Sequence, residues 1–411
     1  MPTIRWTGNG QAVAQRQEVG INVLDLTTTY GITIGGVTIS VAAVTNEAAT
    51  ITALAAALNA SSHPYFKYIT WSKQGSTFPV LRAISDVAGM PHVFTTSAVG
   101  GTGSWEAITI TVANAGPNDI NDPNNWSSLS VPTTSDIIVF ENNSQNVCWG
   151  LDQNSITWAQ LIMKSSYIGR IGLRSDVFAI SADGSSTTTI QEYREDYLKV
   201  KITLTDIGET TSTNNIGSGR IKINNTLSTG SPVINILKTG TASSDSGYPA
   251  IRLLTNNANL ILNVSSAVAG IGIAFERETE TSLLATINNN ASDAQTKIWT
   301  GSGATITTIN SVYGDLHIDA AATITTIKIQ AGNLYLQGNY VVTSLYNYGA
   351  VINADISIGT VYQYNGTIDL TLTSSAKTIT LLKLEGGLLY YDPNYKTITT
   401  IQYGGKVKVQ R

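Results

Sequence analysis

The chain has 411 residues, of which only 13% are charged, and its formal net charge is −4 at pH 7. This weak acidity excludes the basic footprint of a nucleic-acid-binding protein, and the single cysteine, Cys148, excludes an intrachain disulfide. No run of about 18 apolar residues is present to span a bilayer, so we expect no membrane insertion. The first ten residues lack the charged-then-apolar pattern of a signal peptide, which predicts assembly in a cytoplasm.

Residues 1–114 form the first predicted unit, a small α+β module. A β-hairpin is predicted over 30–45, because apolar residues alternate on both sides of a Gly-Gly pair. Asn46 can then cap a helix over 47–60, where Ala, Leu and Ile recur at helical spacing. Strand-like runs follow at 65–71, 78–85, 92–98 and 108–113. His92 has no cysteine or histidine neighbour in the sequence and indicates no site.

Residues 115–160 are predicted to be a linker and a tryptophan-containing cap. Four polar residues loosely follow the spacing of a calcium loop: Asp119, Asn121, Asp122 and Asn124. Ser130 stands where such a loop needs an acid, so Asx turns are the better explanation. Trp126 follows these turns, and its ring can cover the apolar end of a strand stack. Cys148 is predicted to be a small buried apolar residue.

A short motif recurs six times in the last hundred residues. Each copy begins with two aliphatic residues three apart: Ile306/Ile309, Ile324/Ile327, Val342/Leu345, Ile358/Val361, Ile379/Leu382 and Ile398/Ile401. A glycine follows four or five residues later, at Gly314, Gly332, Gly349, Gly366, Gly387 and Gly405. Two residues past each glycine the sequence predicts an inward aliphatic column of Leu316, Leu334, Val351, Ile368, Leu389 and Val407.

A repeat of about 18 residues is too short for two helices, and one unit alone cannot bury a hydrophobic face. Stacked coils of short strands can do so, because each coil packs its inward aliphatic residues on the coils above and below. The sequence therefore predicts a mainly β fold with a parallel β-helix, or solenoid, over 161–411. Longer loops between 172 and 300 are predicted to be insertions at one side of the coil.

Several stretches resemble segments of known proteins. The run DPNNWSSLSVPTTSDIIVF over 122–140 looks like the entry into solenoids of phage and adhesin-type proteins. In the module, ITIGGVTISV and FKYITW are similar to modules of bacteriophage virion proteins, and IGSGRIKIN over 216–224 resembles prophage-encoded β-helix proteins. The chain is thus similar to bacteriophage and prophage virion β-helix proteins. This resemblance implies a right-handed coil, an attachment role for the module and a location on the virion surface.

Asp315, His317 and Asp319 are the best enzymatic candidates in the sequence. Strand alternation places them on one outward face, where two carboxylates and an imidazole could do acid–base work or hold a metal. The next coil, however, supplies only Asn, Tyr and Gln at the facing positions. Asp315 and Asp319 would also stand about 13 Å apart on a strand, too far for a glycosidase pair. The sequence therefore predicts a solvated face with no catalytic residue, metal or cofactor, and a protein that is not an enzyme.

Tyrosine is concentrated in the repeats, where 11 of the 18 lie between residues 313 and 403. We single out Tyr335, Tyr346, Tyr348, Tyr362, Tyr364 and Tyr390. Large rings can fill the corners of a solenoid, form a subunit interface or serve as a platform for sugar rings. Outward aromatic residues can also pack three chains around an axis, which favours a homotrimer.

These observations lead to one preferred function and one alternative. The preferred function is that of a virion structural protein, an exterior capsid decoration protein that contacts other virion proteins through its module and exposes a rigid β-helix. The alternative is a tail fibre or tailspike that binds, and less readily cleaves, host surface polysaccharide.

Overall fold

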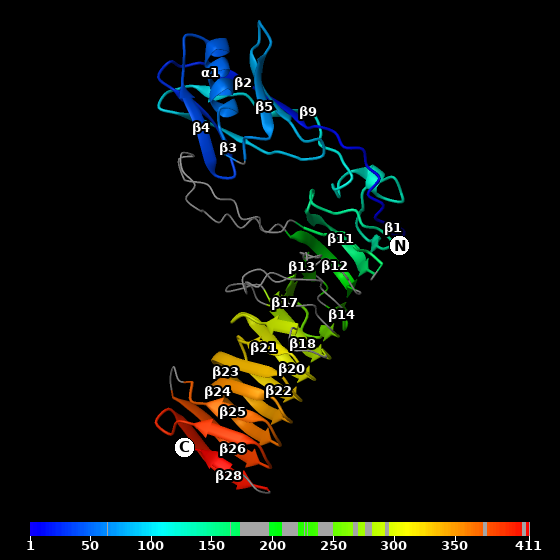
Figure 1. The fold of residues 1–411 in the computed structure, drawn as a ribbon, viewed down its shortest axis with the longest axis vertical. Coiled ribbons are helices and arrows are strands. Elements are labelled where there is room, and N and C mark those ends of the chain that lie inside the picture. Colours follow the sequence, from blue (N-terminus) through cyan, green and yellow to red (C-terminus); the bar gives the residue numbers. More distant parts are fainter. Residues whose placement is uncertain are drawn as a thin grey trace.

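The computed structural model of the protein is an elongated molecule with a small module at one end and a long stack of strands leading away from it (Figure 1). The described residues are 1–63, 65–164, 166–172, 197–207, 221–225, 227, 229–236, 250–265, 270–275, 282–291, 296–372, 376–404 and 408–410. This part of the chain is mainly β. None of its helices is long and apolar enough to cross a membrane.

The N-terminal module packs the helix α1 (Glu47–Asn59) against two antiparallel sheets. One sheet has the order β5–β6–β2, with β8 and β9 beside β2, and the other has the order β4–β3–β7. The bounds are β2 (Arg16–Val23), β3 (Thr29–Ile34), β4 (Val37–Ala42), β5 (Ile69–Gln74), β6 (Val80–Ser85), β7 (Thr95–Val99), β8 (Ser104–Trp105) and β9 (Thr109–Val112). The predicted hairpin, helix and four later strands are all present, with shifted ends. The sequence did not predict β2, which lies in the middle of its sheet.

Local chemistry explains the hairpin and the helix of the module. Gly35 and Gly36 have φ values of +57° and +83°, the geometry that a two-residue hairpin turn of this hand requires. The Oδ1 atom of Asn46 accepts a hydrogen bond from the amide of Ala49 at 2.8 Å, which confirms the predicted N-cap. One face of α1 is buried in the module core, including the fully buried Leu54.

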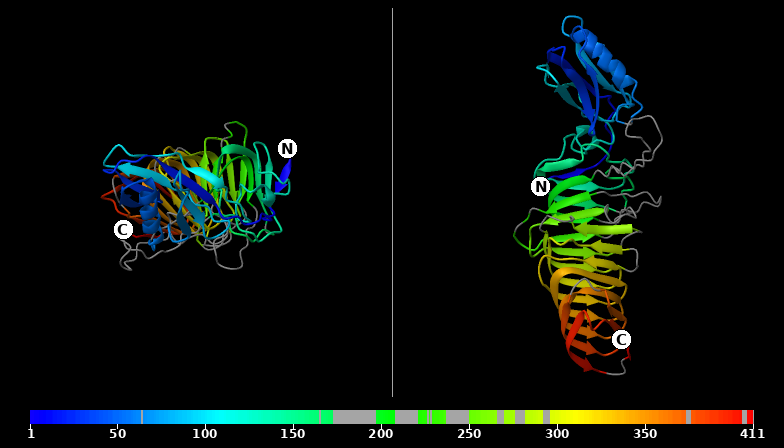
Figure 2. Two further views of the ribbon diagram at one scale, coloured as in Figure 1. Left: turned by 90° about the horizontal axis from the view of Figure 1, so that it is seen from above. Right: turned by 90° about the vertical axis from the view of Figure 1, so that its left-hand side faces the viewer.

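Among the described residues, the other strands form one sheet of 21 strands, which Figure 2 shows as successive rungs. All of its strand pairings are parallel. The strands are β1 (Thr3–Arg5), β10 (Ile137–Phe140), β11 (Asp152–Met163), β12 (Leu198–Ile207), β13 (Ile221–Asn225), β14 (Val233–Ile236), β15 (Ile251–Thr255), β16 (Ile261–Val264), β17 (Gly270–Phe275), β18 (Ser282–Asn289), β19 (Thr296–Trp299), β20 (Ala304–Ser311), β21 (Asp315–Ile318), β22 (Ile324–Ile329), β23 (Asn333–Asn347), β24 (Val351–Gln363), β25 (Thr367–Leu370), β26 (Lys377–Leu384), β27 (Leu388–Tyr391), β28 (Lys396–Tyr403) and β29 (Lys408–Gln410). We call this sheet the stack, and positions that pair in register along it a column.

Most strands of the stack pair with the strand two further along the chain. Thus β16 pairs with β18 and β18 with β20, while β17 pairs with β19 and β19 with β21. The long strands β23 and β24 take part in both series. Two series of strands therefore run side by side, and each strand is held by strands from neighbouring repeats.

The aliphatic pairs of the repeat form two continuous inward columns. Ile327, Leu345, Val361 and Leu382 pair in register and are fully buried. Their partners three residues earlier also pair in register from Ile324 to Ile398. The predicted pairs are therefore confirmed, and only the last pair, in β28, is half-buried. Each buried aliphatic side chain contributes about 1.5–3 kcal/mol to stability.

The third predicted column is wrong at Val351. This residue pairs with Asn333 and is 43% exposed, while Ile352 pairs with Leu334 and is buried. The reason is that the glycine of this repeat, Gly349, stands one residue earlier, and Ala350 takes the place before the strand that Gly332 takes in the preceding repeat. The spacing from Leu345 to Ile352 is the same as that from Ile327 to Leu334, so the register itself is unchanged. In the last repeat, Gly405 and Val407 lie outside the described residues, and Leu389 pairs with Val409.

An aromatic cluster lies at the first strands of the stack. β1 pairs with β10, so the chain's first strand belongs to the stack although we assigned residues 1–114 to the module. The rings of Trp6 and Trp126 meet edge to face at 5.1 Å, and both lie within 6.1 Å of the Phe140 ring. Trp126 is fully buried, and its Nε1 donates to the carbonyl of Ile120 at 2.8 Å.

Candidate functional site

Four of the six predicted tyrosines lie together on the outside of the stack, and we call them the tyrosine patch: Tyr346, Tyr348, Tyr362 and Tyr364. Pairing of β23 with β24 places Tyr346 opposite Tyr362. Their rings stack with centroids 4.4 Å apart and an interplanar angle of 1°. The rings of Tyr348 and Tyr364 stack at 5.0 Å and 4°.

Buried amides between the tyrosines position the patch. Asn347 and Gln363 are fully buried, so strand alternation turns the residues on either side of each outward. Asn347 donates through Nδ2 to the carbonyl of Ala350 at 3.0 Å and accepts the amide of Ala350 at 2.8 Å. Gln363 donates through Nε2 to the carbonyl of Asn365 at 2.8 Å. These hydrogen bonds close the turns after β23 and β24 and fix where the tyrosines emerge.

The faces of two rings in the patch are covered by their neighbours. The register places Lys328, Tyr346, Tyr362 and Lys383 in one column. Lys328 Nζ lies 5.8 Å from the centroid of Tyr346, and Lys383 Nζ lies 4.9 Å from that of Tyr362. Desolvation, together with the neighbouring tyrosines, raises the pKa of Tyr346. Because both faces of these rings are in use, they offer their edges and hydroxyls to a partner, not a face on which a sugar can stack.

The same column is built of amides in the preceding strands. Asn310 donates to Asn288 at 3.0 Å, Asn288 to Asn263 at 2.9 Å and Asn263 to Asn235 at 2.9 Å. The column thus changes from a hydrogen-bonded ladder to stacked rings and cations, and in both parts its side chains bind one another.

The other two predicted tyrosines lie apart from the patch. The Tyr335 ring stacks on His317 at 4.3 Å, and His317 stacks on Trp299 at 4.5 Å. Tyr390 belongs to the same column but is separated from Tyr335 by Asn353 and Asp369. The six tyrosines therefore do not form one surface.

Asp315 and His317 are held by contacts with each other and with side chains of the neighbouring strands. Asp315 Oδ1 lies 3.3 Å from His317 Nε2, and its Oδ2 lies 3.8 Å from Lys297 Nζ. Both faces of the His317 ring carry aromatic neighbours, and the residues beside Asp315 in its column are Lys297 and Asn333. Asp319 accepts the amide of Ala320 at 2.8 Å, and burial raises the pKa of its carboxyl. Strand alternation is as predicted, but the face is a stacked, half-buried one and not a solvated one.

The residues spaced like a calcium loop make Asx turns, as predicted. Asp119 accepts the amide of Asn121 at 2.9 Å, and Asp122 accepts that of Asn124 at 2.9 Å. The other oxygen of Asp122 accepts the amide of Gly116 at 3.1 Å. Within the described ranges, no three His, Cys, Asp or Glu side chains are grouped as they would be to hold a metal ion.

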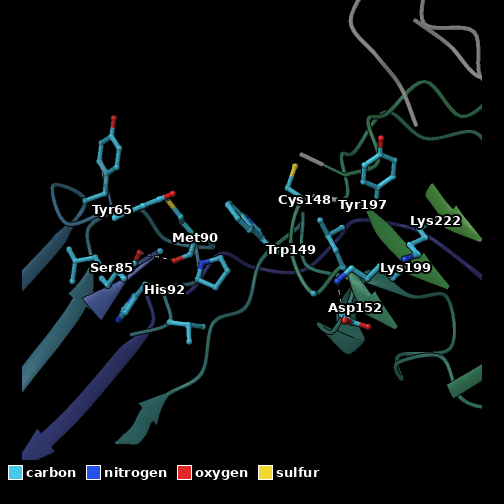
Figure 3. A pocket seen from close by; sticks show the side chains of 18 of the residues that line it. Tyr65, Ser85, Met90, His92, Cys148, Trp149, Asp152, Tyr197, Lys199 and Lys222 are labelled. Carbon is cyan, nitrogen blue, oxygen red and sulfur yellow. Dashed lines mark hydrogen bonds and ion pairs between the residues drawn. The ribbon is translucent and has the colours of Figure 1, made fainter. Parts of the chain in front are cut away.

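A cleft of about 520 Å³ lies between the module and the first strands of the stack (Figure 3). From the module it is lined by Tyr65, Tyr68 and His92, and from the stack by Trp149 and Tyr197 among others. Lys199, Lys222 and Arg252 also line it and form one column on β12, β13 and β15. Asp152 precedes this column and lies 3.4 Å from Lys199 Nζ. The Arg252 guanidinium lies 5.5 Å from the Tyr197 ring centroid.

Two residues that line this cleft, His92 and Cys148, were assigned no function from the sequence. His92 is 8% exposed, neither ring nitrogen has a hydrogen-bond partner among the described residues, and burial lowers its pKa to about 4. Cys148 is half-buried, whereas its neighbour Val147 is the fully buried residue, and burial raises the pKa of the thiol. The prediction of a buried apolar cysteine was therefore only partly right. The sequence did contain a pattern that could have predicted the column of cations. The strand-like segments LKVKITL, GRIKIN and AIRLLT each carry a cation on the outward face.

Comparisons of the chain with protein-family models, with curated proteins and with solved structures found no match.

Proposed function

We propose that the stack is a parallel β-helix, right-handed as the phage resemblance implies, and that the protein is an exterior capsid decoration protein of a bacteriophage or prophage virion. The observation that carries this proposal is the unbroken inward register of aliphatic residues from Ile324 to Ile398 and from Ile309 to Ile401. Such a series packs each repeat on the next and makes a stiff body of simple shape. A stiff body with a separate folded module at one end suits a protein whose module docks on a virion while the rest of the chain projects from it.

The outward columns support a structural role over an enzymatic one. Polysaccharide hydrolysis on adjacent strands needs a pair of carboxyl groups about 5–9.5 Å apart. The described neighbours of Asp315 are instead a lysine and an asparagine, and the column of the tyrosine patch contains amides, rings and lysines. We therefore propose that the protein is not an enzyme and that its module contacts other virion proteins.

The tyrosine patch supports a homotrimer in which the patch is the subunit interface. Tyr348 and Tyr364 are 44% and 40% exposed, and tyrosine is enriched in the cores of protein interfaces. Analytical ultracentrifugation is expected to give three chains for the native protein and fewer for a Tyr348→Ser, Tyr364→Ser double variant. A native monomer would contradict the trimer.

The docking proposal is tested by adding purified full-length protein to purified empty phage heads and, separately, to host cells. Saturable binding to heads with background binding to cells is expected. Saturable binding to cells alone would overturn the decoration function. No reducing ends are expected when the protein is incubated with bacterial surface polysaccharide, and release that Asp315→Ala abolishes would establish an enzyme.

A tail fibre or tailspike that binds host polysaccharide is the second candidate, favoured by the exposed rims of Tyr348 and Tyr364. A sugar ring cannot stack at the centre of the patch, because neighbouring side chains cover the faces of Tyr346 and Tyr362. Loss of cell binding in the Tyr348→Ser, Tyr364→Ser variant would favour this second function.

A further inference from the structure

We propose that the module pairs with a second copy of this chain through the outer edge of β4, so that two antiparallel β4 strands join their sheets into one. This contact does not involve the tyrosine patch and does not depend on a virion location. It can therefore coexist with the proposed homotrimer.

Other outer strands of the module carry features that hinder pairing with another chain. β5 contains Lys73, and a lysine at a sheet edge keeps other strands away. β9 has only four residues, and its pairing with β2 shifts register between Arg16 and Gln17. Trp105 covers the edge of β7, because its Nε1 donates to the carbonyl of Ser97 at 2.8 Å. β4 lacks such protection, since its sequence VTISVA has no charge, proline or glycine and its pairing with β3 has no register shift.

The outer edge of β4 presents main-chain donors and acceptors to its surroundings. The turn between β3 and β4 has two residues, so Ile34 and Val37, which flank it, form a hydrogen-bonded pair, and such pairs alternate along the hairpin. The main-chain N–H and C=O groups of Thr38, Ser40 and Ala42 therefore point away from β3. All three residues are exposed, and no residue in the described part of the chain bonds to these outward groups. Such an edge is a template for another strand.

β4 is complementary to a second copy of itself. Val37, Ile39 and Val41 share its inner face and are only half-buried against the module core. With a two-fold axis at Ile39, antiparallel pairing sets Ile39 opposite its own copy and Val37 opposite Val41 of the other copy. Each half-buried aliphatic side chain then gains an aliphatic neighbour on the same face of the joined sheet. The main chains of Thr38 and Ser40 exchange hydrogen bonds in the same register.

The absence of charge at this edge favours a second copy over a strand of another protein. A residue close to a two-fold axis meets its own copy, so a charge there would face a like charge. β3, β4 and β7 contain no charged residue, and Glu47 is the only one in the adjacent helix α1. An interface with a different protein gains specificity from complementary charges, which these strands do not supply.

Cysteine cross-linking of the full-length protein tests both the pairing and its register, with Cys148→Ser in every variant. A strand pair of this length buries less than about 1,200 Å², so the contact is weak in dilute solution and has to be trapped. Ile39→Cys sets two thiols opposite each other in a non-hydrogen-bonded pair, where Cα atoms lie about 4.5 Å apart and a disulfide fits. Oxidation with copper phenanthroline should therefore give a dimer on a non-reducing gel.

Val37→Cys and Val41→Cys are matched controls on the same face of β4. Alone, each cysteine stands about 13 Å along the strand from its own copy and should give at least about tenfold less dimer than Ile39→Cys. A mixture of the two variants should restore cross-linking, because Val37 faces Val41 across the axis.

The proposal is overturned if neither Ile39→Cys nor the mixture gives a dimer, or if Val37→Cys alone cross-links as well as Ile39→Cys. It is also overturned if Ile39→Cys, oxidised together with purified empty phage heads, cross-links to a head protein and not to itself. The edge of β4 would then pair with a strand of another protein.

Discussion

The N-terminal module and the stack use opposite ways of burying apolar surface. The module folds antiparallel strands and one helix around a single core that includes Leu54, and most of its strand pairings join segments far apart in the sequence, such as β2 with β6 and β3 with β7. The stack has no comparable centre. Its core is a row of equivalent positions such as Ile327, Leu345 and Val361, each supported by the strands before and after it.

The two regions should respond differently to a destabilising substitution. A core around one centre unfolds as a unit, whereas a row of repeats transmits a defect to its neighbours through shared interfaces. The two regions should therefore unfold in separate transitions, and substitutions in one should leave the other transition in place.

The largest expected effect is that of a core cavity. Leu345→Ala should lower the unfolding free energy of the stack by about 2–5 kcal/mol, because the leucine is fully buried between two strands. Leu54→Ala should lower that of the module by a similar amount and leave the stack transition unchanged. Urea unfolding followed by circular dichroism and tryptophan fluorescence measures both. A single transition that both variants shift together would contradict independent unfolding of the module and the stack.

Acid should weaken the module through His92. Burial holds its pKa at about 4, below the ordinary value of 6.5, so the unfolded chain binds this proton more readily. Stability of the module should be unaffected by His92 above pH 6.5, fall as the pH drops from 6.5 to 4, and lose about 3 kcal/mol in all. His92→Gln should remove this slope in urea titrations at pH 4, 5, 6 and 7. An unchanged slope in the variant would show that other groups cause it.

Loss of a buried turn amide should have an intermediate effect on the stack. Asn347→Ala leaves the backbone groups of Ala350 without their side-chain partner and should cost about 1–3 kcal/mol. Asn46→Ala in the module removes only the helix cap and should cost about 0.5–2 kcal/mol. Thermal unfolding of the two variants compares them directly. A greater loss from the cap than from the turn amide would contradict this ranking.

The smallest effect is expected at the surface of the stack. Lys383→Ala removes a cation over the Tyr362 ring and should cost no more than about 1 kcal/mol. Lys383→Arg keeps the cation over the ring and should cost less. A loss of more than about 2 kcal/mol of unfolding free energy in Lys383→Ala would mean that this column also stabilises the core of the stack.

Regular spacing in the sequence was enough to predict the paired aliphatic columns, because a repeat with a constant motif keeps its register. Prediction failed at Val351 because the column was counted from the glycine, and Gly349 stands one residue earlier in its repeat than Gly332 does, whereas the inward position keeps its spacing from the aliphatic pair. In the module, β2 went unrecognised although its segment RQEVGINV carries a strand signal, with Val19, Ile21 and Val23 at every second position.

The high tyrosine content of the repeats was enough to single out these residues, but it could not predict which of their rings stack. Stacking depends on the pairing of β23 with β24 and on the buried amides between the rings. The cleft could not be predicted at all, because it joins residues from Ile34 to Arg252. The cations that line it stand in three separate segments, and only strand pairing brings them into a column.

We propose that the module docks on a virion while the stack projects from it. Electron microscopy of virus particles from the source of the protein tests this proposal, with one gold label on the module and another on β28, at opposite ends of the molecule (Figure 1). Both labels are expected on the capsid surface, with the β28 label farther from the particle centre than the module label. Particles without label, or a β28 label closer to the particle than the module label, would contradict the claim.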